Sequence, residues 1–337
     1  MDLDTFFTTL YVLIDDWYKQ DVVSQMKRHA GAELQMSDSE VLTIALASRW
    51  RVGVPWQSER GIVRYIHRHG QQWFPRMLKI SQFNRRVRDL WAVAVRFQQV
   101  LAEALKQAEE FYEVVDCTEL RHCTLAHAAS HKRQWLSGKL GRGGNNGGWY
   151  YGEQLLLSVT ARGVITGWLV GLANVDDRWM MEAFVSTRHS QMQLIEPEVV
   201  EKKQYETRLI PTPESFGPAI TTGVESAVPY LADDGFNGQR WIDHWSDMYG
   251  VEVIAAPPKN ARNAWNQKEK KWLSHYRQIV ETTIARLCET FGLKRLNAHS
   301  DWGKIARLAT MMAAYNLGIL LNRRLGRTDG SLATLIQ

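Results

Sequence analysis

Three carboxylates stand where they could hold a divalent metal. Asp116 follows the β-branched and aromatic run FYEVV (111–115), and Asp233 follows the apolar run PYLA (229–232). Both runs have the composition of strands, and functional residues of open α/β sheets gather at the carboxyl ends of strands. The third carboxylate is Glu281. Carboxylate oxygens suit Mg²⁺, and two such ions about 4 Å apart can activate a hydroxyl and stabilise a leaving oxygen in phosphodiester chemistry.

Glu281 belongs to a helical pattern rather than to a strand. In the stretch 276–295, YRQIVETTIARLCETFGLKR, apolar residues recur at i, i+4, i+7 and i+11 and so share one face. Arg277 stands one turn before Glu281 at the edge of that face. The pair could be a helix ion pair worth a few tenths of a kcal/mol, or a metal ligand held by its neighbour. With 36 acidic residues in the chain, residue types and spacing alone leave both interpretations open.

The elements before these carboxylates are predicted to be helical. Apolar residues at helical spacing run from Leu3 to Trp17, and Ser37 and Glu40 form a capping-box pattern before VLTIALA. Further helices are predicted over 58–69 and 81–108. Residues 1–108 are therefore expected to form an all-helical N-terminal domain.

An α/β pattern follows. The runs QLLLSVT (154–160) and VITGWLVG (164–171) predict a hairpin, and ANVDD (173–177) predicts the cap of a helix over 176–188. Residues 189–227 are polar and rich in proline, which indicates an insertion or irregular segment. The remaining predicted elements are a helix at 237–248, a strand at 251–256, and helices at 267–291 and 302–325. This order predicts a mixed sheet with flanking helices.

Positive charge is concentrated in two segments. The net charge of the chain is +5, but residues 49–96 carry +9 and residues 259–307 carry +7. Such segments favour a polyanionic partner, with nucleic acid ahead of membrane, although an ordinary solvated surface is the alternative. Candidate phosphate-binding residues in them are Arg85, Arg86, Arg88, Lys259, Arg262, Lys268, Lys270 and Lys271.

The cysteines and the apolar runs indicate a cytoplasmic protein. The three cysteines show no CxxC spacing, so free thiols in a reducing compartment are expected. The start of the sequence lacks the pattern of a signal peptide. The most apolar run, residues 308–321, is too short to span a bilayer, so no membrane partner is expected.

Several motifs together resemble those of bacterial insertion-sequence transposases of the DDE type. VVDCTEL resembles the first-Asp strand of that family, and LADDGFNGQRW its second-Asp motif, A-D-x-G-[YF]. RQIVETTIARLCETFGLKRL followed by AAYNLGILLNRRLG resembles its Glu helix and C-terminal helix, and LDTFFTTLYVLIDDWYK, SDSEVLTIAL and SQFNRRVRDL its helical N-terminal region. The similarity runs nearly the full length of the chain.

The resemblance implies an RNase H-like catalytic domain over 109–296, with a C-terminal helical segment, 297–337, packed on it. By position it implies Asp116, Asp233 and Glu281 as catalytic ligands of two Mg²⁺ ions, for which Mn²⁺ could substitute. Arg277 matches the arginine of the family's R-x3-E pattern and would support catalysis. Some relatives carry a tyrosine and a lysine where this chain has Ser274 and Cys288.

The implied activity is cleavage of DNA at element ends and joining of the 3′ ends to target DNA. The implied partners are the double-stranded terminal repeats and target DNA, and a homodimer or larger assembly is expected because two ends must be held together. The implied location is the bacterial cytoplasm, at the nucleoid. Two alternatives stay open: a metal-dependent nuclease without strand transfer, and an inactive DNA-binding regulator.

Overall fold

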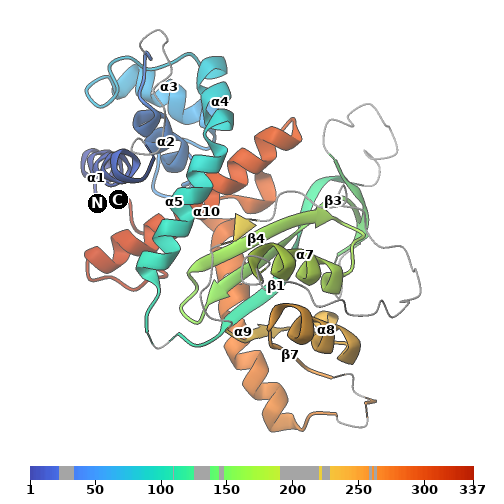
Figure 1. Ribbon diagram of the computed structural model, residues 1–337. Coiled ribbons are helices and arrows are strands. Elements are labelled where there is room, and N and C mark those ends of the chain that lie inside the picture. Colours follow the sequence, from blue (N-terminus) through green and yellow to red (C-terminus); the bar gives the residue numbers. More distant parts are fainter. Residues whose placement is uncertain are drawn as a thin grey trace, which may run out of the picture. The chain divides into compact units, whose positions relative to one another are not determined.

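A computed structural model of the protein describes residues 1–22, 34–108, 110–124, 137–143, 148–189, 220–221, 228–257, 260–261 and 264–337. These residues form two compact units, coloured along the chain in Figure 1. The first unit combines residues 1–105 with 285–337, and the second comprises residues 106–284.

The described residues of the first unit form helices and turns. Asp2 begins the first helix by accepting a hydrogen bond from the backbone N–H of Thr5. The predicted capping box is confirmed: the Ser37 hydroxyl accepts from the Glu40 N–H, and the Glu40 carboxylate accepts from the Ser37 N–H. The helices are α1 (Leu3–Trp17), α2 (Asp38–Ala47), α3 (Glu59–His69), α4 (Ile80–Asp89), α5 (Trp91–Leu105), the end of α9 (Gln267–Glu289) and α10 (Asp301–Arg324).

The structure divides the helix that we expected over 81–108. It forms α4 and α5, separated at Leu90, which ends α4 with non-helical backbone angles. The break lets each helix turn its own apolar residues inward: Phe83 and Val87 of α4 are buried, as is a separate stripe on α5 that includes Phe97 and Leu101. The sequence did not predict the break, because helical propensity is continuous across Leu90.

The C-terminal helix belongs to the first unit. Within that unit α10 packs chiefly along α5 and also contacts α2 and α4. The expected packing of residues 297–337 on the catalytic domain stays a prediction. Nearly every residue of α10 from Ala306 to Asn322 is buried, so the helix needs apolar partners on all sides. The helices of the first unit supply those partners.

The second unit is built on a mixed sheet. Its strands lie in the order β5-β4-β3-β1-β6-β7, with β2 paired to β3. Strands β1, β3 and β4 pair antiparallel, whereas β1, β6 and β7 pair in parallel. The bounds are β1 (Glu113–Thr124), β2 (Lys139–Arg142), β3 (Trp149–Thr160), β4 (Ile165–Leu172), β5 (Ile220–Thr221), β6 (Tyr230–Ala232) and β7 (Val253–Ala255).

Helices α7 (Asp177–His189) and α8 (Gln239–Tyr249) connect these strands, and α9 follows β7. The predicted hairpin is present as β3 and β4, joined by a turn in which Gly163 adopts a positive φ of 82°. This mixed sheet with flanking helices is compatible with the α/β RNase H-like fold that the sequence led us to expect.

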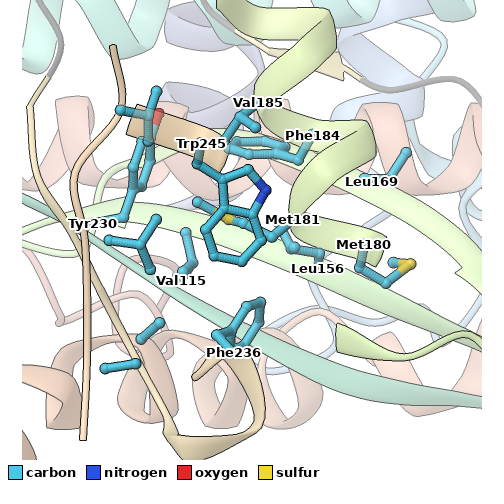
Figure 2. Close-up of a cluster of buried hydrophobic side chains, with 14 residues drawn as sticks. Val115, Leu156, Leu169, Met180, Met181, Phe184, Val185, Tyr230, Phe236 and Trp245 are labelled. Carbon is cyan, nitrogen blue, oxygen red and sulfur yellow. The ribbon is translucent and has the colours of Figure 1, made fainter. Parts of the chain in front are cut away.

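One core packs α7 and α8 against the sheet. It contains Val115 of β1, Leu156 of β3, Tyr230 of β6 and Trp245 of α8, together with four side chains of α7. Figure 2 shows the indole of Trp245 in the middle of the labelled side chains. Because the core fixes Val115 and the neighbouring β6, it also fixes the strand positions next to the two candidate aspartates.

The segment 189–227 lies mostly outside the described residues. The structure describes its first residue, the last of α7, and β5, which pairs antiparallel with β4 at Gly167 and Trp168. The predicted irregular segment therefore contains a short strand. Within the described ranges, no helix is both long and apolar enough to cross a membrane.

Candidate active site

Asp116 and Asp233 lie beside each other on neighbouring parallel strands. Strand β1 pairs with β6 through Glu113–Tyr230 and Val114–Leu231, and continuing this register brings Asp116 level with Asp233. β6 ends at Ala232, directly before Asp233. The expectation that Asp116 ends its strand is wrong, because β1 continues to Thr124 by pairing with β3. Asp116 instead lies where β1 leaves its parallel neighbour.

Arg277 on α9 bridges the two aspartates. Its Nη2 atom lies 3.4 Å from Asp116 Oδ2 and 3.9 Å from Asp233 Oδ2, and all three side chains are largely buried. The Arg277 Nε atom is buried and has no hydrogen-bond partner in the described parts of the chain. One guanidinium therefore supplies the positive charge between two carboxylates that would otherwise repel each other.

The two aspartates are costly to ionise in the absence of a further cation. Burial raises the pKa of Asp116 to about 7, with Arg277 opposing this rise and the Asp233 carboxylate adding to it. Burial also raises the pKa of Asp233, again against the effect of Arg277. The backbone N–H of Cys117 donates to Asp116 Oδ1 at 2.8 Å and fixes the orientation of that carboxylate.

The donor chemistry of this pair fits a hard divalent cation. Two partly buried carboxylates with raised pKa values, within reach of one guanidinium, offer oxygen ligands and an excess of negative charge. A Mg²⁺ ion typically uses one or two protein carboxylates and keeps several waters, so Asp116 and Asp233 suffice as its protein ligands.

Asp177 is a member of this site that sequence analysis undervalued. We expected ANVDD to provide a helix cap, and Asp176 does so by accepting from the backbone N–H of Arg178. Asp177 instead accepts a hydrogen bond from the Cys117 thiol, and burial raises its pKa to about 6 with the Asp233 charge contributing. The available signal was the pair of adjacent acidic residues, Asp176 and Asp177, that follows the second strand of the predicted hairpin.

Gly235 explains how these carboxylates come so close. A Cβ atom at Gly235 would lie 2.7 Å from Asp177 Oδ2 and 3.0 Å from Asp233 Oδ1. The glycine of the A-D-x-G pattern is thus required by the two carboxylates packed against its backbone. Asp233 also accepts from the Gly235 N–H at 2.9 Å, which orients it.

Glu281 does not join the two aspartates in a ready-made metal centre. It is exposed on α9, one turn after Arg277 and on the same side of that helix. Among the residues that the structure describes, no group of three or more His, Cys, Asp or Glu side chains is arranged to hold a metal. Its role as a ligand stays a prediction.

The candidate DNA-binding residues differ in their surroundings. On α9, Lys268 and Lys271 are exposed and Lys270 is half-buried. Lys259 and Arg262 lie outside the described residues. On α4, Arg85 is exposed and Arg88 is half-buried.

Arg86 of α4 has a structural partner. Its guanidinium is ion-paired with Asp38, whose carboxylate also accepts a hydrogen bond from the Tyr18 hydroxyl at 2.5 Å. The ion pair ties α4 to the start of α2, so this arginine has a structural contact in addition to any contact with DNA.

Comparison with known protein families supports the resemblance to DDE-type transposases. Residues 215–317 match a protein-family model described as a transposase DDE domain. The matched segment contains Asp233, Arg277 and Glu281, whereas Asp116 lies before it. This segment of the chain is therefore similar to the DDE domain of transposases. Neither the curated proteins nor the solved structures include a match to this sequence.

Proposed function

We propose that this protein is a DDE-type transposase that cuts phosphodiester bonds at the ends of an insertion sequence and joins the resulting 3′-hydroxyl ends to target DNA. The observation that carries the proposal is the pair Asp116 and Asp233, brought level by parallel strands and bridged by Arg277. A purely structural role would give each buried carboxylate its own partner, because sharing one guanidinium leaves negative charge uncompensated. An added cation would complete the neutralisation.

In this proposal Asp116 and Asp233 hold divalent metal, two Mg²⁺ ions in the family pattern, and Glu281 contributes the third carboxylate. Bound Mg²⁺ supplies activation of the attacking hydroxyl and stabilisation of the leaving oxygen. Arg277 keeps the two aspartates together without metal, and its planar fork of donors also suits a phosphate oxygen pair. The Cys117 backbone N–H orients Asp116, and the Cys117 thiol donates a hydrogen bond to Asp177.

The first unit offers a surface for the DNA backbone. Arg60, Arg64 and Arg68 stand at successive turns of α3, and all three are exposed; we call them the arginine ridge. They have no ion-pair partner within the described parts of the chain, because the acidic residue of α3, Glu59, is buried against Arg49 and Arg307. An unpaired row of guanidinium groups fits the phosphates of double-stranded DNA. The N-terminal helices would thus recognise the terminal repeats, with α4 adding Arg85 and Arg88.

Holding two element ends requires at least two copies of the catalytic unit if each unit acts on one end. We therefore propose that the active form is a homodimer or a larger assembly on DNA. We also propose that the catalytic unit has the RNase H-like fold and that the N-terminal helices form the DNA-binding domain.

The test is cleavage and joining of DNA that carries the sequences flanking the gene, in Mg²⁺, with binding measured separately. Glu281→Gln keeps the size of the side chain and removes its charge. We expect this variant to bind DNA while both chemical steps fall by orders of magnitude. Glu289→Gln is the matched control, because Glu289 is also exposed near the end of the same helix.

Each alternative predicts a different result. Cleavage by the wild-type protein without joining would identify a nuclease. DNA binding without either chemical step would identify a regulator. If Glu281→Gln cuts and joins as well as the Glu289→Gln control, Glu281 is only a helix surface residue.

A further inference from the structure

A continuous row of aromatic rings crosses from the start of β1 to the first half of α9. Trp272 and Tyr276 lie one turn apart on α9 with ring centroids 5.3 Å apart. Tyr276 meets Tyr112 edge-on at 5.4 Å, and Tyr112 meets Phe111 at 5.3 Å. We call these four residues the aromatic row. All of them belong to the second unit.

The two ends of the aromatic row are open to solvent. Phe111 is 71% exposed and Trp272 is 44% exposed, although both are large apolar side chains. The two tyrosines between them are half-buried. Single exposed apolar residues are ordinary, but contiguous aromatic side chains that are partly exposed are typical of binding surfaces.

The charge around the aromatic row favours a nucleic acid as its partner. Lys268 and Lys271 are exposed on the same part of α9, and His275 packs against Tyr276 at 5.3 Å. The neighbouring acid, Glu269, accepts a hydrogen bond from the Asn266 N–H at the start of the helix and so is occupied by capping. Aromatic rings next to lysines are the combination that binds single strands, through stacking of bases and attraction of phosphates.

The aromatic row adjoins the candidate active site. Tyr276 directly precedes Arg277, whose guanidinium reaches Asp116 and Asp233. Trp272 lies five residues before Arg277, which is about 7.5 Å along a helix axis. That length corresponds to roughly two nucleotides at the rise of one DNA strand. A strand bound at the aspartates could therefore place its next bases on these rings.

We propose that the aromatic row stacks unpaired bases of a DNA strand end next to the cleavage site. Only an unpaired or extruded base can present its face to a side chain, so this surface would favour frayed or single-stranded ends over intact duplex. The inference rests on the proposed function for the nature of the strand, and on the ring geometry for the stacking.

The test measures binding without chemistry. A duplex with a short single-stranded end that contains a fluorescent adenine analogue is compared with the blunt duplex, in chelator so that no cleavage occurs. Trp272→Ala should weaken binding of the overhang duplex by about 5- to 150-fold, the equivalent of one stacked base, and leave blunt binding within about twofold. Trp272→Phe should restore most of the loss.

Trp149→Ala is the matched control, because Trp149 is 59% exposed in the same unit and is not part of the aromatic row. Equal losses on overhang and blunt DNA would overturn the proposal. So would a change in oligomeric state of Trp272→Ala without DNA, because the aromatic row would then be an interface between copies of this chain.

The outcomes separate this inference from the proposed function. If the wild-type protein neither cuts nor joins but prefers overhangs through Trp272, the aromatic row stands and the proposed activity fails. If the protein cuts and joins DNA but Trp272→Ala binds overhangs like wild type, the inference about the aromatic row alone fails.

Discussion

The ion pair between Glu113 and Arg188 provides the sharpest test of how the second unit is held together. Glu113 begins β1 and Arg188 lies near the end of α7, and their side chains are 5% and 0% exposed. The carboxylate accepts from Arg188 Nη1 at 2.6 Å and from Nη2 at 2.8 Å. It also accepts from the hydroxyls of Ser158 at 2.6 Å and Thr166 at 2.7 Å.

Glu113→Ala removes all four acceptor contacts and leaves a buried guanidinium without its counter-charge. Breaking one side of a buried, hydrogen-bonded pair costs about 3–5 kcal/mol, and the fully buried Arg188 places this case within that range. Replacing both partners, as in Glu113→Leu with Arg188→Met, removes the charges together. The double variant should therefore recover most of the loss, to within about 1–2 kcal/mol of wild type.

The measurement is the free energy of unfolding in urea, followed through hydrogen exchange of peptides from β1 and β3, which report on the second unit alone. Glu119→Ala on the same strand is the control. Its partner Arg121 is 47% exposed, so loss of that pair should cost less than about 1 kcal/mol.

The same variants have a defined dependence on pH. Burial alone would raise the pKa of Glu113, but Arg188 and the neighbouring hydroxyls hold the pKa below its ordinary value of 4.5. The pair therefore stabilises the fold fully above that value, and the stabilisation is lost as the pH falls below it. The double variant should lose less stability in acid than wild type. A Glu113→Ala variant that costs less than about 1 kcal/mol, or a double variant as unstable as the single one, would refute the reasoning.

Three further results are expected. Asp116→Asn should stabilise the metal-free protein by up to about 4 kcal/mol above pH 7, because a pKa raised from 3.8 to about 7 makes ionisation of Asp116 oppose folding. Urea titrations should show this gain in stability shrinking as the pH falls toward 3.8. A gain that is independent of pH would contradict the prediction. Gly235→Ala should cost at most about 1 kcal/mol of stability, since the new methyl group displaces the flexible ends of Asp177 and Asp233. Strand cleavage should nevertheless fall sharply, and unchanged cleavage would show that the close packing of these two carboxylates is not needed for the reaction. Replacing the three arginines of the arginine ridge by glutamine should reduce the slope of log binding constant against log salt by about 3, whereas Arg240→Gln on α8 should leave it unchanged.

Local sequence signals predicted most elements of the fold. The capping box at Ser37 and the turn at Gly163 act within a few residues, so their effects are visible in the sequence. The position of Asp116 within its strand was not visible in the sequence, because the length of β1 is set by its pairing with β3, about 40 residues away in sequence. Pairing between distant strands leaves no mark in the spacing of residues.

The candidate site shows the same division. The motif pattern located Asp233 and Arg277, and the structure brings them within 3.9 Å of each other. Charge counting could not show that Arg86 is ion-paired with Asp38, or that Asp177 lies against Gly235. Those facts depend on which surfaces meet after folding, and the type of a residue alone does not determine its partner.

The first unit is assembled from two stretches of chain that are synthesised far apart in time. The stripe on α5 that α10 covers is complete at Leu105, but α10 begins at Asp301, after the whole second unit. At about 5–20 residues per second, translation leaves that stripe without its partner for roughly ten to forty seconds. During this interval the N-terminal helices have an open apolar face, which other nascent copies or chaperones can bind. Closure of the helical unit is thus a late event in biosynthesis, so a chain that stops before α10 would carry the arginine ridge on an unfinished domain.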